Sequence, residues 1–110
     1  MTLVYNKLVR DKIPKILEDK GKEFSIEFYH DDKKYLEALR RKLIEETDEF
    51  AESNCSVEEL VDIEEVIHAI LKFKGISYEE FEKLRLKKLK ERGAFDNRIR
   101  LLSIEEESRC

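Results

Sequence analysis

Glycine and proline are scarce in this chain, and this scarcity restricts the fold more than any other feature of the sequence. The 110 residues contain only 3 Gly and 1 Pro. Sandwiches and barrels of β-strands need many tight turns, which these two residue types normally supply. The sequence therefore predicts an all-α fold in which long helices are joined by few connections.

The length fits a single helical domain that spans residues 1–110. An apolar content of 41% is enough to bury one core, and a chain of 110 residues leaves no room for a second. Charged residues make up 44% of the chain, but 22 basic and 26 acidic side chains nearly cancel to a net charge of −4. We expect these charges on helix surfaces, and only residues 105–110 to form a loose polar tail.

Composition also excludes several classes of protein. No apolar run is long enough to span a membrane, and the N-terminus lacks the apolar segment of a secretory signal, so we expect a cytoplasmic protein. An acidic balance disfavours nucleic acid as a partner, because phosphate backbones bind basic surfaces. Cys55 and Cys110 lack the spacing of zinc ligands and are expected to be reduced thiols.

Start and stop signals predict four helices in a bundle-like arrangement. Serine, aspartate or proline starts each helix, two of them in capping boxes with Glu three residues on, and glycine ends three of the four. The predicted boundaries are Pro14 and Gly21, Asp31 or Asp32 and Ser53, Ser56 and Gly75, and Ser77 and Gly93. Between the first two helices, alternation up to Phe28 predicts a short extended piece with one face covered. Residues 94–102 are expected to be irregular or extended.

The helix predicted after Ser56 is unusually apolar. Its apolar residues cover more than half of its circumference: Leu60, Val61, Ile63, Val66, Ile67, Ile70, Leu71 and Phe73. Such a helix is expected either at the centre of a bundle or at a contact with a second chain. We therefore expect a homodimer or a larger homo-oligomer.

Four acidic residues fall in positions that direct them towards the core. Glu46 and Glu49 are three residues apart, and so are Glu59 and Asp62, so each pair projects two carboxylates in roughly one direction on a helix. Glu59 lies within the apolar arc of its helix, Asp62 lies at the edge of that arc, and Glu46 flanks the apolar stripe of the preceding helix. We expect these carboxylates to face inward.

Converging carboxylates need a positive charge, because four of them could not all stay ionised near a core. All the candidate ligands are hard oxygen atoms without Cys or clustered His beside them, which favours Mg²⁺ or Mn²⁺. Ion pairs are the alternative: Lys42, Arg41 or Lys87 could neutralise some of these acids without a metal.

Two motifs resemble a known family. Glu45-Glu46-x-x-Glu49 followed by Glu59-x-x-Asp62 resembles the paired acidic motif of the MazG-like all-α nucleoside triphosphate pyrophosphatases. The opening Tyr5–Pro14 and the later Arg92–Phe95 are similar to a small single-domain branch of that superfamily, described as phosphoribosyl-ATP pyrophosphohydrolase-like or house-cleaning pyrophosphatases.

The resemblance implies hydrolysis of a nucleoside triphosphate between its α and β phosphates, which yields a monophosphate and pyrophosphate. By motif match, Mg²⁺ would be held by four carboxylates, those of Glu46, Glu49, Glu59 and Asp62. Glu45 would act as a catalytic carboxylate that orients or deprotonates the attacking water. The triphosphate charge would be neutralised by Lys7, Arg10, Lys88 and Arg92.

Two other functions stay open at this point. Phosphoribosyl-ATP as substrate would keep the chemistry and change only the nucleotide. A helical module without catalysis, which binds a nucleotide or a protein partner, would instead use the acids in structural ion pairs.

Overall fold

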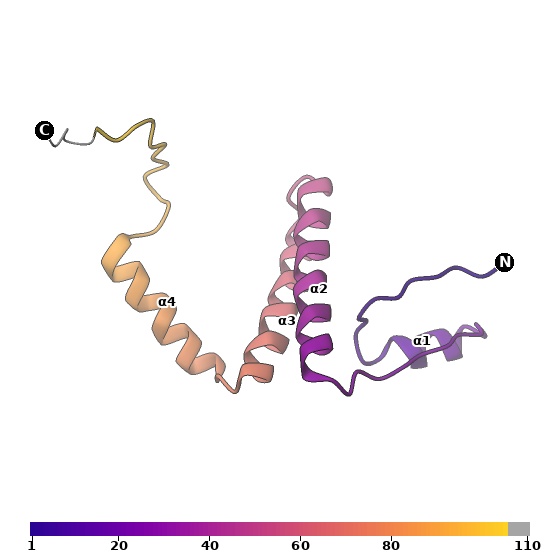
Figure 1. Cartoon of the computed structure of the whole chain (residues 1–110). Helices are drawn as coiled ribbons and strands as arrows, with labels where there is room; N and C mark the ends of the chain where they lie inside the picture. Colours follow the sequence, from indigo (N-terminus) through magenta and orange to yellow (C-terminus); the bar gives the residue numbers. More distant parts are fainter. Residues whose placement is uncertain (106–110) are drawn as a thin grey trace, which may run out of the picture. The chain divides into compact units, whose positions relative to one another are not determined.

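The computed structural model describes residues 1–105, and this part of the chain is all-α (Figure 1). The four helices are α1 (Ile13–Asp19), α2 (Asp32–Glu52), α3 (Val57–Lys74) and α4 (Tyr78–Arg92). No strand occurs within residues 1–105. The predicted all-α class is confirmed, and each helix lies where the start and stop signals place it. Cys110 and the rest of the predicted tail after residue 105 lie outside the described residues.

Two helices begin at polar caps that the sequence predicts. The Oδ1 atom of Asp31 accepts the backbone N–H groups of Lys33 at 2.8 Å and of Lys34 at 3.3 Å. At the start of α3, the hydroxyl of Ser56 accepts the N–H of Glu58 at 3.3 Å. Each cap pairs N–H groups that have no acceptor inside the first turn of a helix.

Left-handed residues end α2 and α3. Asn54 has φ 60° and follows α2, and the next N–H, that of Cys55, donates to the carbonyl of Phe50 at 3.0 Å. Gly75 has φ 72° and ends α3 in the same way. Glycine and asparagine are the residues that adopt this conformation at the least cost, so the two helices stop sharply.

The chain divides into two compact units, Met1–Ser77 and a second that begins at Tyr78. In the first unit α2 and α3 lie side by side (Figure 1). The rings of Tyr35, near the start of α2, and Phe73, near the end of α3, meet edge to face at 5.5 Å, so the two helices run antiparallel. The buried apolar side chains lie on this pair of helices: Ala38, Leu39, Val66 and Leu71.

Several apolar side chains of the first unit remain exposed. Residues 22–30 form neither helix nor strand, and Phe24, Ile26 and Phe28 are exposed, so the predicted covered face is not found. A single extended piece has no neighbouring strand in residues 1–105 to pair with its backbone or shelter one of its faces. Leu60 and Val61 of α3 are exposed as well, at 46% and 60%.

The second unit contains α4 and the residues that follow it. Arg85 and Glu82 form an ion pair one turn apart on this helix. Gly93 has φ 81° and ends it, and residues 93–105 form neither helix nor strand, as the sequence predicts. None of the helices in residues 1–105 combines the length and the apolar character needed to cross a membrane.

Candidate functional site

The four predicted metal ligands lie together on α2 and α3, with Glu46 at their centre. Carboxylate oxygens of Glu46, Glu59 and Asp62 lie within 4.8 Å of one another. Glu46 also forms a second group of the same size with Glu45 and Glu49. We call these five residues the acidic cluster. The spacing of three residues on each helix and the antiparallel pairing of the helices bring the two groups to one place.

Glu46 is the most unusual member of the cluster, because it is a buried carboxylate. Only 6% of the residue is exposed. Its Oε1 atom lies 3.3 Å from the ammonium group of Lys42, but its Oε2 atom is buried and has no hydrogen-bond partner in the part of the chain that the structure describes. Burial raises the pKa of Glu46, and the negative charge of Glu49 raises it further.

Glu59 repeats this feature on the facing helix. Its Oε2 atom is also buried without a hydrogen-bond partner among residues 1–105. A buried polar atom without a partner costs free energy, and a carboxylate oxygen costs more than a neutral group. Both oxygens belong to one group of acids, and a bound cation would offset this cost.

Basic residues surround the exposed side of the cluster. The ammonium group of Lys7 donates to Oε1 of Glu45 at 2.6 Å, and that of Lys42 donates to Oε2 of Glu45 at 3.3 Å. The hydrogen bond from Lys7 lowers the pKa of Glu45, and the same contact raises the pKa of Lys7. Nη2 of Arg10 donates to Oδ1 of Asp62 at 2.6 Å. Lys7 and Arg10, predicted as phosphate ligands, thus lie at the acidic cluster.

The ion pairs test the alternative of a cluster without a metal. Of the three cations proposed for that role, Lys42 does contact the cluster. Arg41 instead pairs with Glu37 at 3.1 Å, and Lys87 lies on α4 in the second unit. The ion pairs give cationic partners to Glu45 and Asp62. They leave the buried Oε2 atoms of Glu46 and Glu59 without partners among the described residues. Ion pairing by the described residues therefore accounts for only part of the cluster.

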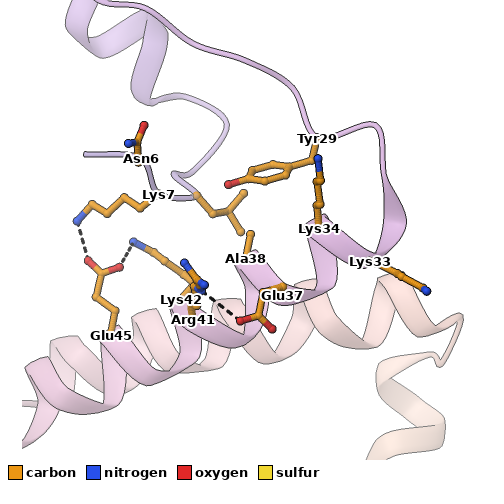
Figure 2. A pocket seen from close by; sticks show the side chains of 11 residues that line it. Asn6, Lys7, Tyr29, Lys33, Lys34, Glu37, Ala38, Arg41, Lys42 and Glu45 are labelled. Atoms are coloured by element: carbon orange, nitrogen blue, oxygen red, sulfur yellow. Dashed lines mark hydrogen bonds and ion pairs between the residues drawn. The ribbon is translucent and has the colours of Figure 1, made fainter. Parts of the chain in front are cut away.

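A pocket of about 360 Å³ adjoins the cluster, between the N-terminal segment and α2 (Figure 2). Lys42 and Glu45 line the pocket and also belong to the ion pairs of the cluster. Lys34 and Tyr29 line the pocket too, although they were not predicted as site residues from the sequence. The signal for Lys34 was present, because it precedes Lys42 by eight residues and Glu45 by eleven, and these spacings place all three on one side of a helix.

Lys88 and Arg92, the other two predicted phosphate ligands, lie on α4. That helix belongs to the second unit, so the structure describes them apart from the acidic cluster. Their predicted contact with phosphate stays a prediction.

The donor atoms of the cluster fit a hard divalent cation. All five residues offer carboxylate oxygens, and the groups contain neither sulfur nor imidazole. Oxygen ligands of this kind suit Mg²⁺ and Mn²⁺, which commonly retain water and meet phosphate oxygens in their sites. An arrangement that gathers carboxylates beside lysine and arginine can hold a cation and a polyphosphate at the same place.

The resemblance to MazG-like pyrophosphatases rests on the acidic motifs, on Tyr5–Pro14 and on Arg92–Phe95, and it stays a prediction. Comparison with known proteins finds no match to this chain, neither a family model, nor a curated protein, nor a solved structure.

Proposed function

We propose that this chain is a Mg²⁺-dependent nucleoside triphosphate pyrophosphohydrolase, which cleaves the bond between the α and β phosphates to give a monophosphate and pyrophosphate. One observation carries the proposal: the buried Oε2 atom of Glu46 has no partner among residues 1–105, at the point where the two groups of acids meet. A divalent cation would remove the cost of that buried charge.

The cation would be held by Glu46, Glu49, Glu59 and Asp62. When bound, it supplies positive charge to the phosphate oxygens at which negative charge develops during hydrolysis. The substrate phosphates also need protein cations. Lys7 and Arg10 are suited to this task because they are half-exposed and already lie beside the acids. They would exchange Glu45 and Asp62 for phosphate oxygens when the substrate binds.

Glu45 is the best candidate for the general base. Its side chain is 27% exposed at the edge of the cluster, and the hydrogen bond from Lys7 lowers its pKa, so the move of Lys7 to a phosphate would free Oε1 and make Glu45 a stronger base. It would accept a proton from the attacking water while the water oxygen bonds to a phosphorus of the α–β linkage. The bridging P–O bond breaks, pyrophosphate leaves as an anion, and the proton passes from Glu45 to solvent.

The cellular setting is part of the same proposal. We infer a house-cleaning enzyme of the cytoplasm that removes non-canonical or excess nucleotides. The exposed side chains of Leu60 and Val61 on α3 support a homodimer or a larger homo-oligomer in which they are covered. Lys88 and Arg92 would contribute further positive charge to the bound phosphates.

A second candidate function is favoured by the ion pairs. Lys7–Glu45 and Arg10–Asp62 are both formed at 2.6 Å, as expected of a helical module that binds a nucleotide or a partner without catalysis. Phosphoribosyl-ATP, by contrast, would be a different substrate for the same cleavage. An activity assay separates these cases.

The assay measures pyrophosphate released from a panel of normal and modified nucleoside triphosphates and from phosphoribosyl-ATP, each with Mg²⁺. The protein is compared with a double variant, Glu46→Gln with Asp62→Asn, and with Glu65→Gln, which removes an exposed carboxylate of α3 outside the cluster. We expect release by the wild type and by the control, and a loss of about 100-fold or more in the double variant. Absence of release from every substrate, or equal release by the double variant, would refute the enzyme.

A further inference from the structure

We propose that the pocket between the N-terminal segment and α2 holds the base of the nucleotide substrate against the ring of Tyr29, with the phosphates directed towards Glu45. This inference rests on the proposed function and adds to it the place where the nucleoside end binds.

The walls suit a flat apolar group. Leu8 and Ala38 contribute apolar surface, and Tyr29 presents its ring (Figure 2). The volume of about 360 Å³ lies in the range of pockets that bind small molecules. Tyr29 is 44% exposed, so part of its ring remains accessible to a ligand. Stacking on an aromatic ring is a common way for proteins to bind a base without selecting a sequence.

Tyr29 is held in position although its segment has no regular structure. Its ring lies 6.2 Å from the ring of Tyr35 on α2. Tyr35 in turn contacts Phe73 of α3 edge to face, which joins Tyr29 to the helix pair. A ring anchored in this way loses little conformational freedom when a base stacks on it.

The charge of the pocket suits a ligand that carries several negative charges. Five basic and two acidic side chains line it, which leaves an excess of positive charge. Glu37 is bound by Arg40 and Arg41, and Glu45 by Lys7 and Lys42. These pairs already occupy both acids of the pocket, so its other cations are left to attract an anion from solvent.

The two ends of the pocket differ, and this sets the direction of the ligand. Figure 2 shows Tyr29 and Lys34 at one end and Lys7, Lys42 and Glu45 at the other. Glu45 belongs both to the pocket and to the acidic cluster. A base at Tyr29 would therefore leave the sugar and phosphates extending along α2 towards the carboxylates that hold the cation.

The test measures binding without hydrolysis. Calorimetry gives the Kd of an α,β-methylene nucleoside triphosphate and of inorganic tripolyphosphate, each with Mg²⁺. Tyr29→Leu is expected to weaken binding of the nucleotide analogue about tenfold and to leave binding of tripolyphosphate within twofold. Tyr29→Phe keeps the ring and should bind the analogue within twofold of the wild type. Phe28→Leu is the matched control, because Phe28 is 76% exposed in the same segment and does not line the pocket.

Equal affinity of wild type and Tyr29→Leu for the analogue would overturn the inference, and so would a parallel loss for tripolyphosphate. A second measurement needs no variant: nuclear Overhauser effects should connect the base protons of the bound analogue to the ring of Tyr29 in the wild type, and contacts only to another of the 4 tyrosines would contradict the proposal.

Failure of the proposed function has a different signature. Analogue binding that depends on Tyr29, without pyrophosphate release from any substrate, would uphold the pocket and refute the enzyme. Hydrolysis with a KM that Tyr29→Leu does not change would uphold the enzyme and refute the pocket as the place where the base binds. A wild type that binds neither the analogue nor tripolyphosphate would refute both.

Discussion

The substitution Glu46→Gln should stabilise the protein without Mg²⁺ and make it less stable than the wild type with Mg²⁺. Without the metal, Glu46 is a buried carboxylate with one unpartnered oxygen, and burial raises its pKa. An acid whose pKa is higher in the folded than in the unfolded chain destabilises the fold once pH exceeds the unfolded value. We therefore expect Glu46→Gln to raise the free energy of unfolding of the metal-free protein at pH 7.

The ion pair with Lys42 does not change the expected direction of this effect on stability. Lys42 lies 3.3 Å from Glu46 and lowers its pKa, but desolvation is the larger cause and the net shift is upward. Lys42 also keeps Glu45 as a partner at 3.3 Å after the substitution. The stability gained by Glu46→Gln should vanish near pH 4 and below, where Glu46 is protonated in both the folded and the unfolded chain.

Bound Mg²⁺ should favour the wild type instead. A ligand at 100 times its Kd stabilises the folded state by about 2.7 kcal/mol. If loss of the central carboxylate weakens binding about 100-fold, the same Mg²⁺ concentration stabilises Glu46→Gln by only about 0.4 kcal/mol. The difference in metal binding is about 2 kcal/mol and favours the wild type, so with Mg²⁺ the wild type should melt above Glu46→Gln.

Thermal unfolding followed by circular dichroism, with and without Mg²⁺ at pH 7, measures both effects. Glu65→Gln, exposed on α3, serves as the control and should follow the wild type in both conditions. The reasoning is refuted if wild type and Glu46→Gln keep the same order of melting temperatures in the two conditions. It also fails if Glu46→Gln melts below the wild type without metal.

Three further predictions concern the helix pair and its surface. Leu39 is 1% exposed, so Leu39→Ala should lower the free energy of unfolding by about 2–5 kcal/mol in urea titrations, and a loss below about 1 kcal/mol would contradict its place in the core. Gly75→Ala should lower the free energy of unfolding by about 1 kcal/mol, because a residue with a Cβ is strained at a φ of 72° although the new Cβ would meet no atom within 4 Å. An unchanged melting temperature would show that this conformation is not strained for Ala. The pKa of Glu37 is lowered to about 2 by hydrogen bonds from Arg40 and Arg41, so its carboxyl carbon should titrate near that pH by nuclear magnetic resonance. Replacing both arginines by Gln should move the midpoint up towards 4.5, and a midpoint that stays near 2 would exclude them as the cause.

Local signals in the sequence predicted the helices well, because each depends on residues close together in the chain. Asp31 and Ser56 act as caps, and Gly75 ends its helix in the left-handed conformation. The acidic cluster was predictable for the same reason. Spacing within each helix fixes the direction of its acids, and a short connection brings the helices face to face.

Contacts between distant residues could not be predicted in this way. Lys7 and Glu45 are separated by 38 residues, and Arg10 and Asp62 by 52, so the path of the N-terminal segment decides whether they meet. That segment contains no periodic pattern, and the alternation up to Phe28 predicts an extended piece without indicating which element it lies against. The place of Tyr29 in the pocket was missed for this reason, because it depends on how the segment before α2 leads the chain back to that helix.

The four residues between Glu52 and Val57 also have a consequence for how the protein folds. Glu46 and Asp62 lie on either side of this connection, only 16 positions apart, whereas Lys7 and Arg10 lie much farther away in the chain. Closing a short loop costs less entropy than closing a long one, and contacts between nearby residues form faster. The carboxylates should therefore come together as soon as the α2–α3 hairpin closes, before the N-terminal cations arrive. If the proposed function is right, Mg²⁺ present during refolding should accelerate that first step, because a bound cation would offset the repulsion between the gathered carboxylates.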